Sequence, residues 1–266
     1  MPGFQEMAER EKEIERLQKL LNSVKGFPEG SPLRAEAYIK TLEDMLQDLM
    51  TEPQQGECWD FSNEKSWSVF AQDESLILRP IGIADLEFYI GIRTQYSVLC
   101  RVMVETEAHK SESWFINDAC QPEDFFCVIE SVAEQKPIGY IGLKDTRNDL
   151  WEIAIELDNQ CTGKGYGPNS VRLFLNEIYK ITGRAEYQAR IDTNNLPSQK
   201  CFEKIGAELV GLCDGPILKL PDEKKRFEDK NLNLIDNHMR ELASRLGVEP
   251  RKLLSHVLDY RLTCPL

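Results

Sequence analysis

The sequence predicts an α/β (α+β) protein whose central sheet is mixed. Three strand-like runs at 125–131, 137–145 and 150–158 follow one another across short turns, which predicts an antiparallel meander. The segment from 150 to 212 then alternates strand and helix, and this order favours parallel pairing. We therefore expect an antiparallel N-terminal half of the sheet, followed by parallel strands.

The first 52 residues predict a helical hairpin. Apolar residues recur at spacings of three and four in 4–24 and again in 33–50, and the stretch KGFPEGSP separates the two runs. Two such helices would pack antiparallel, with poor stability in isolation because one apolar seam stays uncovered. That seam needs a partner, which is either the main domain or a second copy of the chain in a homodimer.

The other expected elements follow in chain order. Strands are expected at 66–71 and 75–80, and helices at 83–96 and 98–109. After the meander we expect helices at 168–182 and 196–206, alternating with strands at 185–192 and 207–212. Residues 221–250 read as a charged helical insertion with an apolar face of Leu232, Leu234, Ile235, Met239, Leu242 and Leu246, before a last strand at 255–262. The expected divisions are a hairpin at 1–52, a main domain at 67–220, the insertion at 221–250 and a final strand segment at 251–266.

Composition narrows the classes of function. A formal net charge of −13 disfavours nucleic acid as a partner and would attract a cationic ligand, although acidity can also serve solubility alone. No apolar run approaches the roughly 18 residues of a membrane helix, and the charged N-terminus lacks the apolar centre of a secretory signal. We expect a cytoplasmic protein without a membrane partner. The eight cysteines form no CxxC pair and the three histidines do not cluster near them, so we expect neither a metal site nor a disulfide framework.

The stretch NQCTGKGYGPN, residues 159–169, places three glycines just before an amphipathic helical run. A helix start offers unpaired N–H groups and the positive end of the helix dipole, and glycine lets a phosphate approach this backbone closely. The stretch is not a dinucleotide-binding fingerprint, because Pro168 stands where the third glycine is needed. It is not a P-loop either, since Asp158 replaces the first glycine and Gly165 the Ser or Thr. An anion cradle and a plain strand-to-helix turn both remain open on these residues alone.

The wider context resembles the GNAT acetyltransferases. Gln160-x-x-Gly163-x-Gly165, followed by Tyr166 and Gly167, is similar to the pyrophosphate-binding motif of that superfamily. LILRPIGIADLEFY, PIGYIGL and WEIAIELD resemble its first strand and helix, third strand and fourth strand, and the run from Asn195 through Ser198 and Phe202 to Gly206 resembles a later helix motif. The resemblance covers about 67–215 and the final strand, and is nearest to the ribosomal-protein N-terminal (RimJ/RimL-like) branch.

The resemblance implies a GNAT fold, with parallel strands splayed at the cofactor, and acetyl-coenzyme A as co-substrate without a metal. Its pyrophosphate would lie on main-chain amides from Cys161 to Gly167, with Lys164 either adding charge or remaining solvated. The residues implied in cofactor binding are Leu157, Gln160, Cys161, Thr162, Gly163, Lys164, Gly165, Tyr166, Gly167, Asn195, Ser198 and Phe202. A backbone N–H near Ile155 to Leu157 would support the oxyanion of the thioester.

Acetyl transfer to a primary amine needs a base, because such an amine has a pKa of roughly 10 and is mostly protonated at neutral pH. The run LWEIAIELD alternates, so that Glu152 and Glu156 share one face while apolar residues share the other. Glu152 stands where similar enzymes carry a carboxylate, and we expect it to be the general base, with Glu156 as second candidate. The alternative is that Glu152 is an ordinary solvent-facing strand residue.

The proton donor departs from the family pattern. Phe202 replaces the tyrosine common at this position and cannot give a proton, so Ser198 is the expected replacement and Tyr187 a weaker one. Asn195 would either bond the pantetheine arm or cap the helix. Cys161 and Cys201 should lie near the cofactor, but no histidine or other base stands beside them in the sequence, which disfavours an acetyl-cysteine route.

These residues predict an N-acetyltransferase that moves the acetyl group directly to a primary amine within a ternary complex. The acceptor is a small-molecule amine or a peptide N-terminus, and the segments 97–122 and 214–255 expected to bind it match no known motif. The alternative is a non-catalytic acyl-CoA-binding or regulatory protein with an oligomerising hairpin, which Phe202 and Ala207 favour.

Overall fold

A computed structural model gives the fold in two compact units, Met1–Gly56 and Glu57–Leu266. It describes residues 63–97, 123–215 and 220–266, together with 18, 19, 21, 22, 25, 43, 61, 100, 101, 104, 115, 119–121 and 218. In the first unit the helical residues Lys25 and Glu43 form an ion pair of 2.6 Å. The rest of the expected hairpin, its seam and any dimer contact lie outside the described residues, as does most of the helix expected at 98–109.

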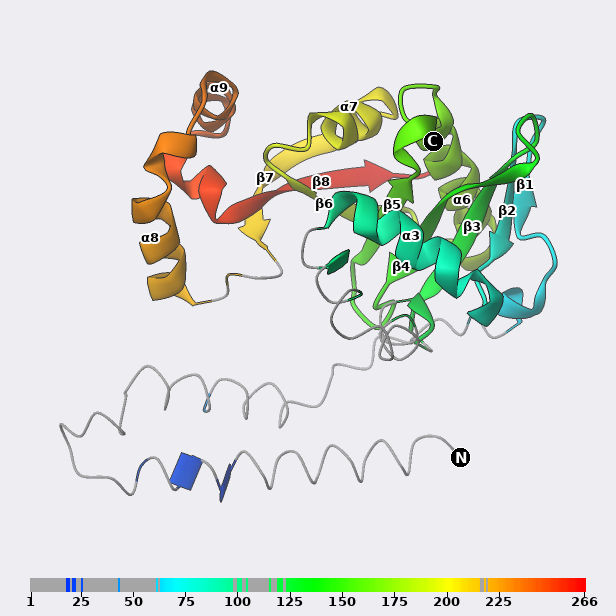
Figure 1. Ribbon diagram of the computed structural model, residues 1–266, viewed down its shortest axis with the longest axis horizontal. Helices are drawn as coiled ribbons and strands as arrows, with labels where there is room; N and C mark the ends of the chain where they lie inside the picture. Colours follow the sequence, from blue (N-terminus) through cyan, green and yellow to red (C-terminus); the bar gives the residue numbers. More distant parts are fainter. Residues whose placement is uncertain are drawn as a thin grey trace. The chain divides into compact units, whose positions relative to one another are not determined.

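The second unit is built on an eight-stranded sheet with the order β1-β2-β3-β4-β5-β6-β8-β7. Strands β1 to β5 form a continuous antiparallel run, and β5 and β6 make the parallel pair. Figure 1 shows this order, with β7 and β8 at one end of the sheet and β1 and β2 at the other. The strands are Ala71–Gln72 (β1), Leu76–Pro80 (β2), Phe125–Ser131 (β3), Lys136–Lys144 (β4), Trp151–Leu157 (β5), Glu186–Asp192 (β6), Glu208–Asp214 (β7) and His256–Thr263 (β8). The predicted α/β (α+β) class with a mixed sheet is confirmed.

The helices take their bounds from local signals. Helix α6, Tyr166–Thr182, lies between two left-handed glycines, Gly165 and Gly183. Helix α7, Leu196–Lys204, and helix α9, Asn237–Leu246, begin where an Asn or Asp side chain accepts a main-chain N–H. The remaining helices are α3 (Leu86–Tyr96), α8 (Pro221–Lys230) and the short 3-10 turns η1 (Glu64–Ser66), η2 (Ile83–Asp85), η4 (Asn159–Cys161), η5 (Leu232–Leu234) and η6 (Pro250–Leu254).

Two apolar clusters lie on opposite faces of the sheet. The larger cluster includes Trp151 of β5, Phe174 of α6 and Phe202 of α7, and the smaller includes Tyr89 and Ile92 of α3. Alternate residues of a strand point to opposite faces, so α6 and α7 cover one face while α3 covers the other over β4 and β5. Figure 1 shows α3 in front of these strands. A buried Phe or Leu of this kind contributes about 1.5–3 kcal/mol.

Three expectations are wrong. The strand expected at 66–71 is reduced to Ala71–Gln72, because residues 64–66 form the turn η1. Parallel pairing is confined to β5 and β6: β8 lies between β6 and β7 and is antiparallel to both. The insertion 221–250 is two short helices, and Leu232 and Leu234 are 48% and 56% exposed in the turn between them, so they do not share the buried face of Met239 and Leu242.

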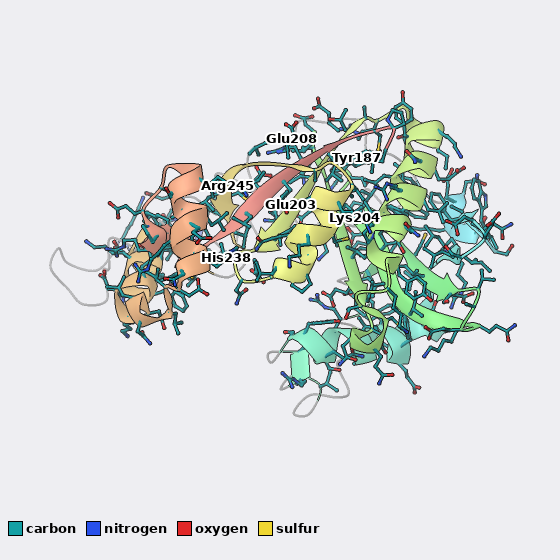
Figure 2. All side chains as sticks on the ribbon, turned by 90° about the horizontal axis from the view of Figure 1, so that it is seen from above. Tyr187, Glu203, Lys204, Glu208, His238 and Arg245 are labelled. Carbon is teal, nitrogen blue, oxygen red and sulfur yellow. The ribbon has the colours of Figure 1, made fainter. Side chains whose placement is uncertain are left out.

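Polar contacts join the insertion to the sheet and to α7, in addition to the apolar packing of Met239, Leu242 and Ala243 in the larger cluster. Glu203 of α7 accepts a hydrogen bond from the Tyr260 hydroxyl of β8 at 3.2 Å and pairs with Arg245 of α9 at 3.7 Å. Figure 2 shows Glu203 and Arg245 on facing helices. The buried carboxylate of Glu228 in α8 accepts from Ser255 and Arg251 beside β8. The last strand therefore reaches its place in the sheet with the insertion attached to it.

Candidate functional site

The glycine-rich stretch forms the connection from β5 to α6. The 3-10 turn η4, Asn159–Cys161, begins where the Asp158 side chain accepts the N–H of Gln160 at 2.9 Å. Gly163 and Gly165 then take φ values of 76° and 88°, a left-handed conformation that favours glycine. Gly165 is the residue before the first turn of α6. The chain thus turns abruptly from strand to helix.

The main-chain N–H groups from Thr162 to Gly167 have no acceptor in the part of the chain that the structure describes. Just upstream, the N–H groups of Asn159, Gln160 and Cys161 are all bonded within the protein. A Cβ placed on Gly163 or Gly165 would meet nothing within 4 Å. The helix start is therefore an open set of donors with the positive end of the helix dipole behind it, which can hold an anion.

Beside this loop, β5 and β6 separate. They pair only at Trp151–Tyr187 and Glu152–Gln188, although β5 continues to Leu157. The N–H of Asp158 donates to the Ile138 carbonyl, and hydrogen-bonded pairs alternate along an antiparallel ladder. The main-chain groups of Ile155 and Leu157 consequently point away from β4, towards the opening. An extended polar chain could pair with this free edge.

Lys164 of the loop is already occupied. Its ammonium pairs at 2.9 Å with Glu134, which follows β3 and also pairs with Lys136 at 3.1 Å. The hydrogen bonds from Lys164 and Lys136 lower the pKa of Glu134. Glu134 is a residue that the sequence did not single out, and its position in a short polar turn gives no signal of this contact.

Other loop residues are fixed by their neighbours. The Tyr166 hydroxyl lies 3.2 Å from the Ser131 hydroxyl, and the Thr162 hydroxyl donates to the Asn159 carbonyl. A Cβ on Gly167 would lie 3.0 Å from the Cys201 sulfur, so the start of α6 packs closely on α7.

The end of β5 carries one contact that the sequence did not predict. The Leu157 carbonyl accepts a hydrogen bond of 2.7 Å from the hydroxyl of Tyr96, the last residue of α3. Burial, followed by the negative charges of Glu156 and Asp158, raises the pKa of Tyr96. Tyr96 is therefore a protonated donor at the mouth of the opening.

The two acidic candidates of β5 lie on the face opposite α6, each bonded to an arginine. Glu152 Oε2 accepts a hydrogen bond of 2.7 Å from Arg190 Nε of β6, and Arg190 Nη2 makes an ion-pair contact of 2.6 Å with the same oxygen. The Glu156 carboxylate accepts from Arg93 of α3 at 2.6 Å. Sequence reasoning found both acids but neither arginine, because alternation along a strand says nothing of which distant residue lies across it.

The candidate residues of α7 and β6 lie partly at the surface and partly in the core. Asn195 caps the helix, since its Oδ1 accepts the Ser198 N–H at 3.1 Å, and Ser198 is half-buried in the first turn. Phe202 is only 2% exposed and belongs to the large apolar cluster. Tyr187 of β6 is fully buried, and its hydroxyl donates to the Arg184 carbonyl at 2.7 Å.

The two thiols near the loop are poor nucleophiles. Burial raises the pKa of Cys161, and the neighbouring charge of Glu134 raises it further. Burial likewise raises the pKa of Cys201 to about 11. Both remain thiols at neutral pH, while the thiolate is the reactive form. Among the described residues no group of three or more His, Cys, Asp or Glu side chains is placed to hold a metal ion, and no described helix is long and apolar enough to cross a bilayer.

Comparisons with known proteins identify this arrangement. A family model for the acetyltransferase (GNAT) domain matches residues 75–208, whereas no curated protein matches the chain. Similar solved structures include a chimera of the spermidine N-acetyltransferase SpeG from Vibrio cholerae and hSSAT, at 14% identity and a TM-score of 0.49, covering 71% of this chain and 95% of that one. RimJ from Mycobacterium smegmatis, in complex with CoA-disulfide, has 15% identity and a TM-score of 0.47, covering 71% and 82%. A domain from Methanocaldococcus jannaschii has 19% identity and a TM-score of 0.47, covering 72% and 100%.

The family model spans half of the chain, from the residue before β2 to the first residue of β7. It includes the loop with the open N–H groups, the separation of β5 from β6, and both acidic candidates. The chain belongs to the GNAT acetyltransferase family and is an acyltransferase.

Proposed function

We propose that the protein is an N-acetyltransferase that moves the acetyl group of acetyl-coenzyme A directly to a primary amine within a ternary complex. The observation that carries this proposal is the open run of N–H groups from Thr162 to Gly167 beside the separation of β5 and β6. The first feature suits a diphosphate and the second suits an extended amide-containing arm. The two occur next to one another at the end of β5.

The residues present fit acetyl-coenzyme A, which supplies the acetyl group as an activated thioester. The amides from Thr162 to Gly167 would hold its diphosphate, with Gln160 and Cys161 in the turn that opens the loop. The free edge at Ile155 and Leu157 would hold the pantetheine amides. For Lys164 to reach a phosphate, it must leave Glu134. The Asn195 side chain caps α7, so its role at the site can be to fix this helix rather than to bind the cofactor directly.

Glu152 is the proposed general base, acting directly or through water. The acceptor ammonium has a pKa of roughly 10.4 and must lose its proton before the nitrogen lone pair can attack. Glu152 is the last residue of β5 that pairs with β6 before the two strands separate, and its side chain lies on the sheet face opposite α6 and α7. Its bond to Arg190 holds the carboxylate in one orientation.

The negative charge that develops on the thioester oxygen needs a fixed donor. The Ile155 N–H points into the opening and is the proposed one, because main-chain donors on a strand need no reorganisation. Ser198, in the first turn of α7, is proposed to protonate the leaving thiolate. Phe202, buried among apolar side chains, forms part of the wall behind the arm. The protonated state of Cys161 and Cys201 supports direct transfer.

The proposed acceptor is a small amine or a peptide N-terminus, and the proposed location is the cytoplasm, with the RimJ/RimL-like branch as the nearest group by sequence motif. The test is a panel of amines and N-terminal peptides incubated with acetyl-coenzyme A, with released thiol as readout. Transfer to at least one primary amine is expected. Tight binding of coenzyme A without thiol release on any amine would refute the enzymatic proposal.

That negative result would favour the second candidate, a non-catalytic acyl-CoA-binding protein. Two observations support it: Phe202 is buried in the core, and Glu152 is tied to Arg190. The variant Glu152→Gln separates the two candidates by thiol release: an enzyme loses turnover at unchanged affinity for coenzyme A, whereas a binder releases no thiol with or without the substitution. Calorimetric titration with coenzyme A gives the affinity.

A further inference from the structure

On the sheet face opposite α6 and α7, three charged residues lie on neighbouring strands. Glu152 of β5 shares a row with Gln188 of β6, and Arg190 follows two residues later on the same face. Arg190 stands directly opposite Asp259 of β8 across the antiparallel pair. Arg190 thus lies between a carboxylate on each side, Glu152 towards β5 and Asp259 towards β8.

Arg190 is bonded to only one of these two carboxylates, that of Glu152. Arg190 Nε donates a hydrogen bond of 2.7 Å to Glu152 Oε2, and Arg190 Nη2 makes an ion-pair contact of 2.6 Å with the same oxygen. Burial opposes a positive charge here, but the bond to Glu152 and the negative charges of Glu152 and Asp259 raise the pKa of Arg190. Arg190 therefore stays charged. When the Glu152 carboxylate becomes a neutral acid, Arg190 loses its charged partner.

Asp259 is an incomplete partner. It is 8% exposed, and its Oδ2 accepts a hydrogen bond of 2.7 Å from Arg261. Its Oδ1 is buried without a partner among the described residues. A buried carboxylate oxygen without a donor is unfavourable, and native structures rarely leave one without a reason.

The other groups on this face do not supply that donor. Lys144 of β4 faces Glu152 across the β4–β5 pair. Cys213 of β7 stays a neutral thiol, because burial and then the charge of Asp259 raise its pKa, and a thiol is only a weak hydrogen-bond donor. A Cβ on Gly211, opposite Asp259 on β7, would meet nothing within 4 Å. Arg190 is the cation directly opposite Asp259 across the β6–β8 pair, while Arg261 of β8 itself bonds the other oxygen, Oδ2.

We propose that Arg190 exchanges partners during the reaction, holding Glu152 in the resting enzyme and moving to Asp259 Oδ1 when Glu152 takes the proton of the acceptor amine. This rests on the proposed role of Glu152 as base. The proton passes from the amine nitrogen to the Glu152 carboxylate, which becomes a neutral acid. Arg190 then shares the single negative charge of Asp259 with Arg261, each arginine bonded to one carboxylate oxygen. Asp259 is a positioning residue that acts through Arg190.

A crystal structure of Glu152→Gln tests the exchange without any activity, because glutamine mimics the protonated glutamate. We expect the Arg190 guanidinium within hydrogen-bond distance of Asp259 Oδ1. An Arg190 side chain that remains on the glutamine, or turns to solvent while Oδ1 stays without a partner, overturns the proposal. This outcome does not depend on whether the protein acetylates amines.

Kinetics give a second test. We expect Asp259→Asn to lower kcat about tenfold in the wild-type background and to have no further effect in the Arg190→Gln background, because only neighbours in one network couple. Asp192→Asn, exposed on the same face of β6, is the matched control and should leave kcat unchanged. Effects of Asp259→Asn that are equal in both backgrounds overturn the proposal. A wild-type protein that is inactive on every amine refutes the proposed function, not the exchange. In that case, and also if Asp259→Asn does not fold, the crystal structure of Glu152→Gln alone tests the exchange.

Discussion

The two ends of α6 allow the anion cradle to be tested with a matched pair of substitutions. Gly165 precedes the helix at φ 88° and Gly183 follows it at φ 71°, and a Cβ on either would meet nothing within 4 Å. Alanine in this left-handed conformation costs about 1–2 kcal/mol. A stiffer unfolded chain offsets about 0.4–1 kcal/mol of that cost. Gly183→Ala should therefore lose roughly 1 kcal/mol of stability, and Gly165→Ala, whose loop can relax, should lose no more than that.

Their binding of coenzyme A should differ. Alanine at 165 is expected to let the free loop relax out of the left-handed conformation, so that binding must restore it against about 1–2 kcal/mol. This corresponds to a dissociation constant raised about 5- to 30-fold. Gly183→Ala, at the opposite end of the helix, should bind as the wild type does. Denaturant unfolding gives the stabilities and calorimetric titration the affinities. If the two variants bind coenzyme A equally well, the open N–H groups before α6 are not the diphosphate site.

Two further predictions concern ion pairs. Glu134→Gln should tighten coenzyme A binding severalfold, because it releases Lys164 from its ion pair. Glu177→Gln removes an exposed ion pair on α6 and, as the control, should not change the affinity measured by titration. An unchanged affinity of Glu134→Gln would exclude Lys164 as a phosphate ligand. Burial alone would raise the pKa of Asp85, but two hydrogen bonds from Arg79 and one from the Gly82 N–H outweigh it and lower that pKa below 3.8. The contribution of Asp85 to the free energy of unfolding is thus present above pH 3.8 and is lost as the pH falls through the lowered pKa. Asp85→Asn should therefore destabilise the protein by about 1–3 kcal/mol at pH 7 and by much less at pH 2. An equal loss of stability at both pH values would contradict this.

The parts of the fold that local sequence could predict are those set by short-range pattern. The alternation of 150–158 predicted which β5 residues face the core, and the structure buries Trp151 and Ile153 as expected. The glycines at 163 and 165 predicted a sharp turn into a helix, and both adopt positive φ. In each case the deciding interaction lies within a few residues, so the sequence carries it directly.

The order of the last strands could not be predicted in this way. Alternation of strand and helix favours parallel neighbours, and β6 and β7 do run in the same direction, because each pairs antiparallel with β8. Whether a later strand inserts between them depends on the whole segment that precedes it. Here the insertion with α8 and α9 carries the chain back to the sheet before His256.

The arginines of the site were missed for a related reason. Arg190 lies 38 positions beyond Glu152, and Arg93 lies 63 positions before Glu156. A charged residue on a half-exposed strand or helix face is common in any soluble protein. Only the register between strands shows that such a residue stands beside an acid, and the register is set by the packing of the entire sheet.

The environments of the two acids favour Glu152 over Glu156 as the proposed general base. When a carboxylate takes up a proton, its arginine loses a partner and needs another one nearby. Arg190 has one, since Asp259 stands directly opposite it with an unpartnered oxygen. At Glu156 the unpartnered oxygen is its own Oε2, and the Tyr140 hydroxyl, whose pKa is raised well above its ordinary value by burial and then by the Glu156 charge, stays protonated beside it. Glu152→Gln should therefore reduce kcat far more than Glu156→Gln, by roughly the 10²- to 10⁴-fold contribution of a general base, and equal losses in the two variants would refute this assignment.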